Sequence, residues 1–275
     1  MPLSFSNPLL TEQFDEQGFV LLKGVATEEV ALLHAFIHSR NIRYEGDFYY
    51  SLLSHTYDDN LLIQQNIRQI LQQFYAAWFR NYTVRNESFL VKPCNTGNEL
   101  MLHQDWSYTD ISKFTTGTAW LPLSAVGEKN GTLILLPRSH SCFNQYISGS
   151  IPTLRMPSSA VPQTMLIKPE LQPGDVVVFN PAVFHGSCPN LSGSDRIVVT
   201  ATVFPREAPF IYAHKLASGA IARVALEDDA FLKSLAQFSV GDVPAEKISG
   251  IIRDAQPDLS EAEFRDRFLR LVAPH

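Results

Sequence analysis

Apolar residues recur at helical spacing in two stretches near the start of the chain. The stronger stretch covers residues 60–82, and the weaker one begins at Thr27, which can cap a helix. The positions that repeat every three or four residues in the stronger stretch are Leu62, Ile63, Ile67, Ile70, Leu71, Phe74 and Trp78. Residues 19–22, Phe-Val-Leu-Leu after Gly18, are typical of a strand. The opening therefore predicts a strand and two helices, the longer of which packs against a sheet.

From Ser88 onward the pattern changes to short apolar, β-branched runs separated by turn residues. Strands are predicted over residues 89–91, 100–106, 115–123, 132–136, 164–167, 176–179 and 197–204. The polar, proline-containing segment 137–162 is typical of a long loop. Short strands with helices at the ends predict a mainly β fold with flanking helices, either a β-sandwich or a jelly roll. A nucleotide-binding fold is not indicated, because βαβ alternation and a glycine-rich phosphate loop are both missing from the sequence.

The pattern after residue 205 predicts helices. Residues 228–236 and 244–252 can form short helices, and Ser260-Glu261-Ala262-Glu263 is a capping-box sequence before an apolar run. The length of 275 residues suits one large domain. We expect a single domain over 1–275, with an N-terminal helix and strand support (1–85), a jelly-roll catalytic core (86–206) and a C-terminal helical extension (207–275).

Composition narrows the classes of function. A net charge of −6 without a basic run argues against nucleic-acid binding. The three cysteines are scattered, which indicates neither a disulfide framework nor a structural zinc site. The first residues resemble no signal peptide, and no apolar run has the length of a membrane span. These features predict a cytoplasmic protein that acts apart from membranes.

The candidate chemistry begins at His103-Gln104-Asp105. On an extended backbone, His103 and Asp105 point to the same face and can hold a metal together. His185, in the turn-rich segment after the run 176–179, is compatible with a third ligand across a β-sandwich. Two imidazoles and one carboxylate on one face suit octahedral Fe(II), and zinc tolerates the same ligand types. The ligand types alone do not select the metal.

Arg196 adds a second constraint. It stands at the head of the run 197–204, where an inward guanidinium needs an anion, and the neighbouring Asp195 should point to the other face. A dicarboxylate cosubstrate would satisfy it. The far carboxylate of this cosubstrate would pair with Arg196 while its 2-oxo acid end chelates the metal.

Together these motifs resemble the phytanoyl-CoA dioxygenase (PhyH) family of Fe(II)/2-oxoglutarate-dependent oxygenases. The resemblance covers roughly residues 10–205. It rests on residues 14–20 (FDEQGFV), 103–105 (HQD), 116–123 (TGTAWLPL), 130–133 (NGTL), 136–140 (LPRSH) and 185–187 (HGS) followed by Arg196. The sequence departs from the family at Arg138, where glycine is usual.

The resemblance implies a double-stranded β-helix, which is a cupin-like jelly roll. It implies His103, Asp105 and His185 as iron ligands and catalytic residues, and Arg196, Ser187 and Trp120 as residues that bind 2-oxoglutarate. The implied activity is a dioxygenase that consumes O2 and releases succinate and CO2. Related halogenases lack the carboxylate ligand, so Asp105 favours hydroxylation of a C–H bond. Desaturation, epoxidation and ring formation share the same oxidant and stay open.

Alternatives accompany this interpretation. His140 is the rival third ligand, but it follows a Pro-Arg-Ser turn and has no arginine at matching distance. Trp106, Tyr108 and Phe114 either line a substrate pocket or belong to the core. Two other functions stay open: a jelly-roll metalloenzyme that does not use 2-oxoglutarate, and a non-catalytic β-sandwich binding module. A hydrophobic small molecule or a carrier-linked acyl group would suit the aromatic loops, and the sequence does not indicate an oligomeric state.

Overall fold

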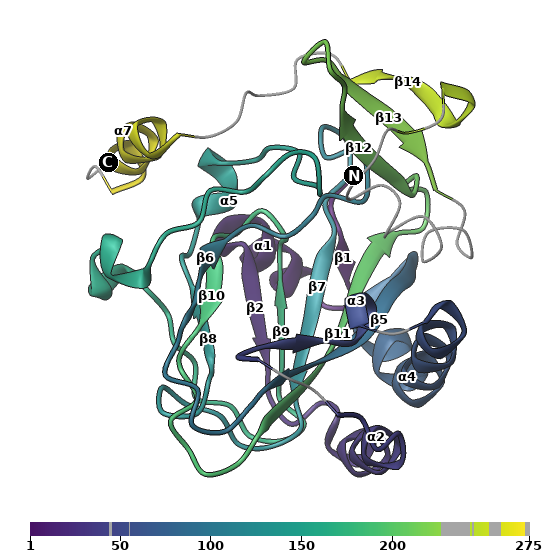
Figure 1. The fold of residues 1–275 in the computed structure, drawn as a ribbon, viewed down its shortest axis with the longest axis vertical. Coiled ribbons are helices and arrows are strands. Elements are labelled where there is room, and N and C mark those ends of the chain that lie inside the picture. The colour runs from purple at the N-terminus through teal and green to yellow at the C-terminus, as the bar shows by residue number, and fades with distance from the viewer. Residues whose placement is uncertain (44–45, 55, 227–242, 244, 253–259, 273–275) are drawn as a thin grey trace.

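Two antiparallel sheets form the centre of the protein (Figure 1), described here from a computed structural model that covers residues 1–43, 46–54, 56–226, 243, 245–252 and 260–272. The six-stranded sheet has the order β2 (Phe19–Leu22), β9 (Val176–Phe179), β7 (Gly117–Pro122), β11 (Arg196–Pro205), β5 (Tyr82–Lys92) and β3 (Tyr49–Tyr50). The three-stranded sheet has the order β6 (Leu100–His103), β10 (His185–Ser187) and β8 (Leu133–Leu135). This is the predicted jelly roll, or double-stranded β-helix.

Helices cover the outer face of the six-stranded sheet. The predicted long helix is α4 (Tyr57–Trp78), and its apolar stripe, including Ile63, Ile67 and Leu71, is buried in the largest core cluster together with residues of the sheet. The helices α1 (Pro8–Gln17) and α2 (Thr27–Ser39) contribute Phe14 and Leu33 to the same cluster. All six residues of β7 are buried, because this strand is covered on both faces. The central strands therefore form a rigid support for whatever lies on the inner face.

Short elements complete this part of the chain. β1 (Ser4–Phe5) pairs with β4 (Phe79–Arg80), and α3 (Ser51–Ser54) follows β3. The first 85 residues do not only support the jelly-roll core from outside. Two of their strands, β2 and β3, belong to the six-stranded sheet itself. No helix within the described ranges has both the length and the apolar character that crossing a membrane requires.

The segment before β9 differs from the prediction. The strand expected over 164–167 is wrong: residues Gln163–Met165 form the short 3-10 helix η2, and Ile167 makes a single bridge to Leu135. Prolines at 162 and 169 flank this stretch and limit regular strand pairing. The long loop 137–162 is confirmed as mainly irregular, with the short helices α5 (Ser139–Cys142) and η1 (Ser158–Ala160) within it.

The C-terminal region is only partly helical, which corrects the expected helical extension over 207–275. β12 (Ile211–Lys215), β13 (Ile221–Ala225) and β14 (Ile248–Ile252) form a separate antiparallel sheet. The helix expected over 244–252 is instead the 3-10 turn η3 (Ala245–Lys247) followed by β14, whose isoleucines favour a strand. The helix expected over 228–236 lies outside the described residues.

The last predicted helix is confirmed as α7 (Glu261–Val272). Its capping box is formed: the amide of Glu263 donates to Ser260 Oγ at 3.2 Å, and Glu263 Oε2 accepts from the amide of Ser260 at 2.9 Å. Phe264 stacks on Phe143 with ring centroids 4.9 Å apart, which docks α7 against the loop 137–162. The division of the chain into a core and two flanking segments stays a prediction.

Candidate metal centre

Strand register brings the two predicted histidine ligands together. β10 pairs with β6 so that His185 lies opposite His103, and cross-strand partners in an antiparallel pair project from the same face. The ring centroids are 4.5 Å apart. Gly186 is required here, because a Cβ at this position would collide with the carbonyl oxygen of Leu100 on β6. The His-Gly-Ser sequence therefore combines a ligand with the glycine that lets its strand approach β6.

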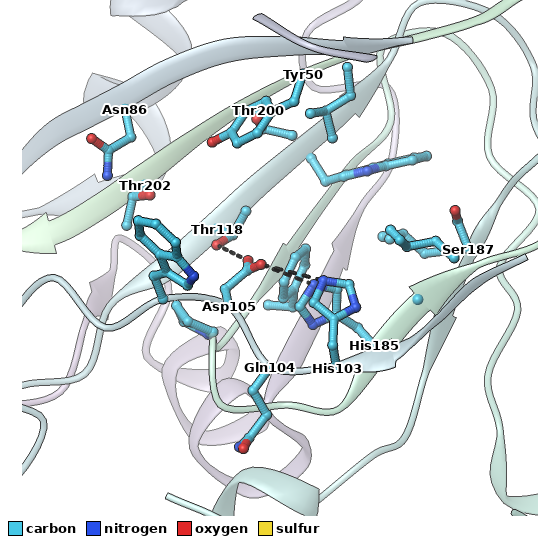
Figure 2. Close-up of a pocket in the computed structure, with 18 of the residues that line it drawn as sticks. Tyr50, Asn86, His103, Gln104, Asp105, Thr118, His185, Ser187, Thr200 and Thr202 are labelled. Atoms are coloured by element: carbon cyan, nitrogen blue, oxygen red, sulfur yellow. Dashed lines mark hydrogen bonds and ion pairs between the residues drawn. The ribbon is translucent and has the colours of Figure 1, made fainter. Parts of the chain in front are cut away.

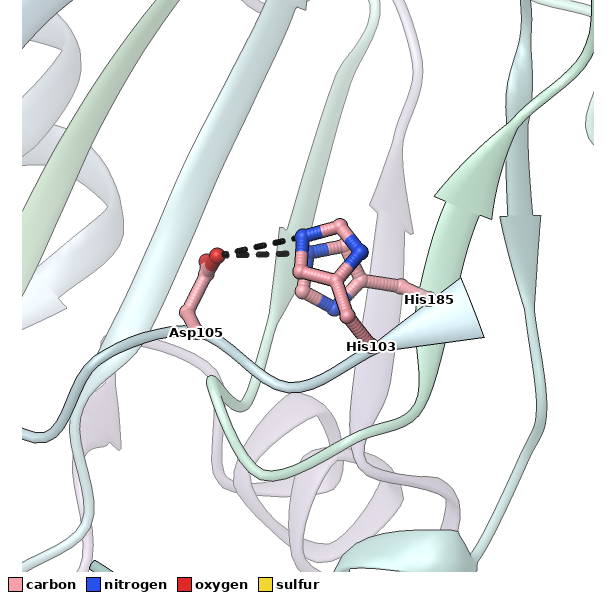
Figure 3. A group of neighbouring side chains, drawn as sticks. All are labelled: His103, Asp105 and His185. Carbon is pink, nitrogen blue, oxygen red and sulfur yellow. Dashed lines mark ion pairs between the residues drawn. The ribbon is translucent and has the colours of Figure 1, made fainter. Parts of the chain in front are cut away.

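Asp105 completes a three-residue group in which all ligand atoms lie within 4.8 Å of one another (Figure 3). Its Oδ1 is 3.4 Å from His185 Nε2 and 3.8 Å from His103 Nε2. Each imidazole uses Nδ1 to bond a backbone carbonyl, that of Met101 at 2.8 Å and that of Val183 at 2.9 Å. These bonds assign the proton to Nδ1 and leave both Nε2 lone pairs directed toward the carboxylate, as metal-binding histidines require.

The residue between the ligands holds the loop in place. Gln104 points away from Asp105 (Figure 2), is buried, and donates to the carbonyl of Ala182 at 2.7 Å. The amide of Asp105 donates to the carbonyl of Pro181 at 2.9 Å. These contacts tie the chain after β6 to the residues just before β10. Asp105 Oδ2 also accepts a long hydrogen bond of 3.4 Å from Thr118 Oγ1 on β7.

The electrostatics suit a cation. Burial and the neighbouring His185 lower the pKa of His103 to about 4, so this imidazole is neutral at physiological pH. Burial opposes ionisation of Asp105, but His185 and the other nearby donors outweigh it, and the pKa of the carboxyl is lowered. Burial likewise opposes protonation of His185, and the carboxylate of Asp105 outweighs it and raises the pKa of His185. The carboxylate thus attracts positive charge, which a metal ion would supply.

The group lies in a cavity of about 500 Å³ between the two sheets (Figure 2). The six-stranded sheet contributes Leu90, Thr118, Trp120, Phe179, Arg196, Thr200, Ala201 and Thr202 to its lining, and the three-stranded sheet contributes Leu100, His103, Leu133, His185, Gly186 and Ser187. Phe179 packs on the ring of His185 at 4.4 Å between centroids, which restricts rotation of that imidazole.

Arg196 is a buried cation in this cavity. It is 2% exposed, and burial lowers its pKa to about 10. The guanidinium carbon lies 5.5 Å from the centre of the Trp120 ring, and no ion pair to Arg196 is found among the described residues. Its Nε and Nη1, like Ser187 Oγ, are buried without a hydrogen-bond partner. Asp195 faces elsewhere, as predicted, with Oδ1 accepting from the amide of Cys94 at 2.8 Å.

A second buried cation adjoins this end of the cavity. Lys92 is paired with Arg196 across β5 and β11, and its Nζ donates to the carbonyl of Cys188 at 2.7 Å. Burial, and then the charge of Arg196, lower the pKa of Lys92 to about 8. Arg196 has donors without partners among the described residues, and Lys92 adds a second positive charge beside it. This end of the cavity fits an anionic ligand, and the His-Asp-His group fits a divalent metal. The residues present therefore suit a metal with a carboxylate cosubstrate.

The other predicted residues separate into two groups. Trp106 and Tyr108 line the cavity, whereas Phe114 lies outside that lining and packs with Phe204 and Phe210. The rival His140 is in α5, where its Nε2 bonds the carbonyl of Asp15 at 3.0 Å, and it does not belong to the ligand group.

Sequence reasoning missed several residues that line the cavity, namely Tyr50, Asn86, Thr118, Arg155, Phe179 and Thr202. Phe179 and Thr118 belong to predicted strands, so strand alternation is a signal that could have placed them. Asn86 precedes the strand predicted from residue 89 and carries no comparable signal.

Comparison with known proteins gives one family. The sequence pattern described as phytanoyl-CoA dioxygenase (PhyH) matches residues 14–198. No curated protein matches the chain.

Three solved structures illustrate the likeness in fold. The epimerase SnoN in complex with Fe3+, alpha ketoglutarate and nogalamycin RO has a TM-score of 0.53 at 17% identity, covering 92% of this chain and 95% of its own. The carbocyclase SnoK from nogalamycin biosynthesis has a TM-score of 0.52 at 19% identity, covering 74% and 86%. HygX from Streptomyces hygroscopicus with nickel and 2-oxoglutarate has a TM-score of 0.50 at 16% identity, covering 73% and 88%. At these identities the likeness shows the fold.

Proposed function

Since the chain belongs to the phytanoyl-CoA dioxygenase (PhyH) family of non-haem Fe(II)/2-oxoglutarate-dependent oxygenases, we propose that it hydroxylates an unactivated C–H bond of a small-molecule substrate. The observation that carries the proposal is the buried guanidinium of Arg196, which has no anionic partner in the described part of the chain and lines the same cavity as the His-Asp-His group. A metalloenzyme without 2-oxoglutarate would have no use for this cation, and a binding module would need neither feature.

In this proposal His103, Asp105 and His185 hold the iron. Iron(II), O2 and 2-oxoglutarate together supply the oxidising power, and one oxygen atom enters the product while the other leaves in succinate, with release of CO2. The Nδ1 bonds to backbone carbonyls keep both imidazoles in the tautomer that binds metal. Asp105 keeps 37% of its side chain accessible because it faces the cavity, so it can reach a metal that enters there.

The cosubstrate binds between the iron ligands and Arg196. The guanidinium pairs with the far carboxylate, and the hydroxyl of Ser187 and the indole N–H of Trp120 help to hold it. The apolar side chains of Leu90 and Leu133 line this part of the cavity, which keeps water away and strengthens the ion pair. The reaction takes place in the cytoplasm, in keeping with three free cysteines.

The substrate enters from the opposite side of the iron ligands. Trp106 and Tyr108 line the cavity there, and both are only partly buried. They offer a flat apolar surface for a hydrophobic molecule or for the acyl part of a carrier-linked one. The function of these residues is to orient one C–H bond and exclude water.

The first test is anaerobic addition of Fe(II) and 2-oxoglutarate, for which the proposal expects a weak visible charge-transfer band. A metabolite screen that follows succinate would then find a substrate. Reaction under ¹⁸O2 tests the outcome, because hydroxylation places a labelled oxygen atom in the product and ring closure or epimerisation does not. Absence of the visible band would contradict the use of 2-oxoglutarate, and an unlabelled product would contradict hydroxylation.

A further inference from the structure

The cavity extends past the iron ligands to an end that cosubstrate binding leaves unexplained. Along β11 the lining residues run from Arg196 to Thr202, and Thr202 pairs with Thr118, the residue that bonds Asp105. Figure 2 shows Asn86 and Thr202 on one side of Asp105 and Ser187 on the other. The iron ligands therefore separate a cosubstrate end from a second end, which contains Asn86.

A β-bulge turns Asn86 toward this end. Thr200 pairs with Ser88 and Thr202 pairs with Arg85, so two residues of β5, Asn86 and Glu87, lie opposite one residue of β11. Asn86 has a φ of 59°, in the left-handed region that asparagine adopts more readily than most residues. Bulges commonly redirect a side chain beside an active site.

Glu87 holds the bulge in this register. Its carboxylate is buried and binds Arg68 of α4 through two bonds, one of them 2.9 Å from Nη2 to Oε2. A shift of one residue would remove the buried carboxylate from Arg68 and turn it toward the cavity, at a large cost in desolvation. The carboxamide of Asn86 is thus fixed on the cavity side.

The amide nitrogen of Asn86 has no hydrogen-bond partner among the described residues. The residue is 5% exposed, it lines the cavity, and its Nδ2 is buried. Buried amides are nearly always hydrogen-bonded in folded proteins, and one without a partner is destabilising. A ligand oxygen in the cavity would supply the missing acceptor.

The surroundings define the chemistry of that ligand. The charged residues among the described cavity lining are the iron ligands, Arg196 and the exposed Arg155, and none of them is on β5 or in residues 200–202. Trp106 and Tyr108 form an aromatic wall, with ring centroids 6.3 Å apart. A neutral donor beside aromatic rings favours a neutral oxygen on a ring-containing molecule.

We propose that Asn86 is a specificity-determining residue that donates a hydrogen bond from Nδ2 to a carbonyl or hydroxyl oxygen of the substrate. The substrate class is a neutral, ring-containing small molecule whose body lies against Trp106 and Tyr108. This assignment rests on the proposed function, since it places the substrate on the side of the iron ligands opposite Arg196. The hydrogen bond fixes which end of the molecule lies beside the iron.

The test uses 1-tetralone and tetralin, which share a bicyclic skeleton and differ in a carbonyl oxygen. Each is titrated by calorimetry into the anaerobic Fe(II)–2-oxoglutarate enzyme. The wild type should bind the ketone about threefold to tenfold more tightly, the range of one neutral hydrogen bond. Asn86→Gly, which keeps the backbone conformation, should bind both equally, and so should Asn86→Ala, whose side chain has no donor.

The matched control is Asn81→Gly, which replaces an exposed asparagine with a φ of 46° just before β5. This variant should keep the preference for the ketone. The proposal is overturned if the wild type shows no such preference, or if the preference persists in both Asn86 variants. The visible band of bound 2-oxoglutarate is read in the same samples, and its absence from the wild type would contradict the proposed function instead.

Discussion

Within the part of the chain that the structure describes, the buried cation at one end of the cavity has no anion, and the buried amide at the other end has no hydrogen-bond acceptor. Arg196 is part of a regular strand pairing, next to Lys92 and Trp120, and its buried guanidinium requires an anion. Asn86 is on a bulge in the same sheet, and its neutral amide favours a neutral oxygen acceptor. The difference teaches that one sheet can serve two purposes. Its regular strand pairing provides a constant site for the cosubstrate, and a β-bulge in it provides a variable site for the substrate.

Asp105→Ala is expected to have the largest effect on activity, because it removes a ligand of the metal that lies between the two ends of the cavity. Coupled formation of succinate and hydroxylated product should fall by at least about 100-fold, since loss of outer contacts alone costs metal sites 10–100-fold. Asp58→Ala, at the exposed start of α4, is the control and should retain activity. Full coupled turnover in Asp105→Ala would remove this carboxylate from the mechanism.

Arg196→Met should make the protein without cosubstrate more stable. It removes a buried charge that lacks a partner and keeps an apolar side chain against Trp120, so the free energy of unfolding should rise by about 1–3 kcal/mol. Chemical denaturation measures the change, and a given concentration of 2-oxoglutarate should stabilise this variant much less than the wild type. A loss of stability on substitution would mean that the guanidinium has a structural partner.

The lowered pKa of Lys92, at the same end of the cavity, should make the stability of the protein depend on pH. Its pKa is about 8 in the folded protein and near 10.5 when unfolded, so the unfolded chain binds more protons between these values. Stability relative to Lys92→Met should therefore rise with pH from 8 to 10, by about 1–2 kcal/mol in the free energy of unfolding. Denaturation curves of both proteins across this range measure it. A flat difference would show that Lys92 titrates normally.

Ser187→Ala should have the smallest effect. The hydroxyl is buried and without a partner, and its loss should weaken 2-oxoglutarate binding about threefold to tenfold with little change in stability. Titration of the visible band measures the affinity. An unchanged affinity would exclude the hydroxyl from the cosubstrate site, and Ser141→Ala on the exposed part of α5 controls for loss of a serine.

Much of the fold could be predicted because its central strands are apolar on both faces. Residues 19–22 and 176–179 form strands with the predicted bounds, and the helix around Ile63 and Ile67 follows its apolar stripe. The sheet at 211–225 could not be predicted, since β13 reads Ile-Ala-Arg-Val-Ala and contains good helix formers. Its strands depend on pairing with one another, which single-sequence propensity does not report.

The candidate site likewise contains residues that the sequence could identify and residues that it could not. His103, Asp105 and His185 occur in short motifs, which made them recognisable as a ligand group. The cross-strand pairing of His103 with His185 brings the two histidines together, and Asp105 lies just after the end of β6. Phe114, for which a pocket position and a core position were both open, packs in an aromatic cluster outside the cavity lining, after a turn at residues 111–113. Asn86 could not be found, because a bulge and a left-handed φ depend on how β5 pairs with β11 and on the contact of Glu87 with Arg68 of α4.

The most direct test of a two-ended cavity is one anaerobic titration of 2-oxoglutarate, followed by the visible band, on Arg196→Met and Asn86→Gly side by side. The account predicts that Arg196→Met loses affinity by about 30-fold or more, as expected for a buried charged contact, while Asn86→Gly matches the wild type. Equal losses in both variants, or an unchanged affinity in Arg196→Met, would contradict it.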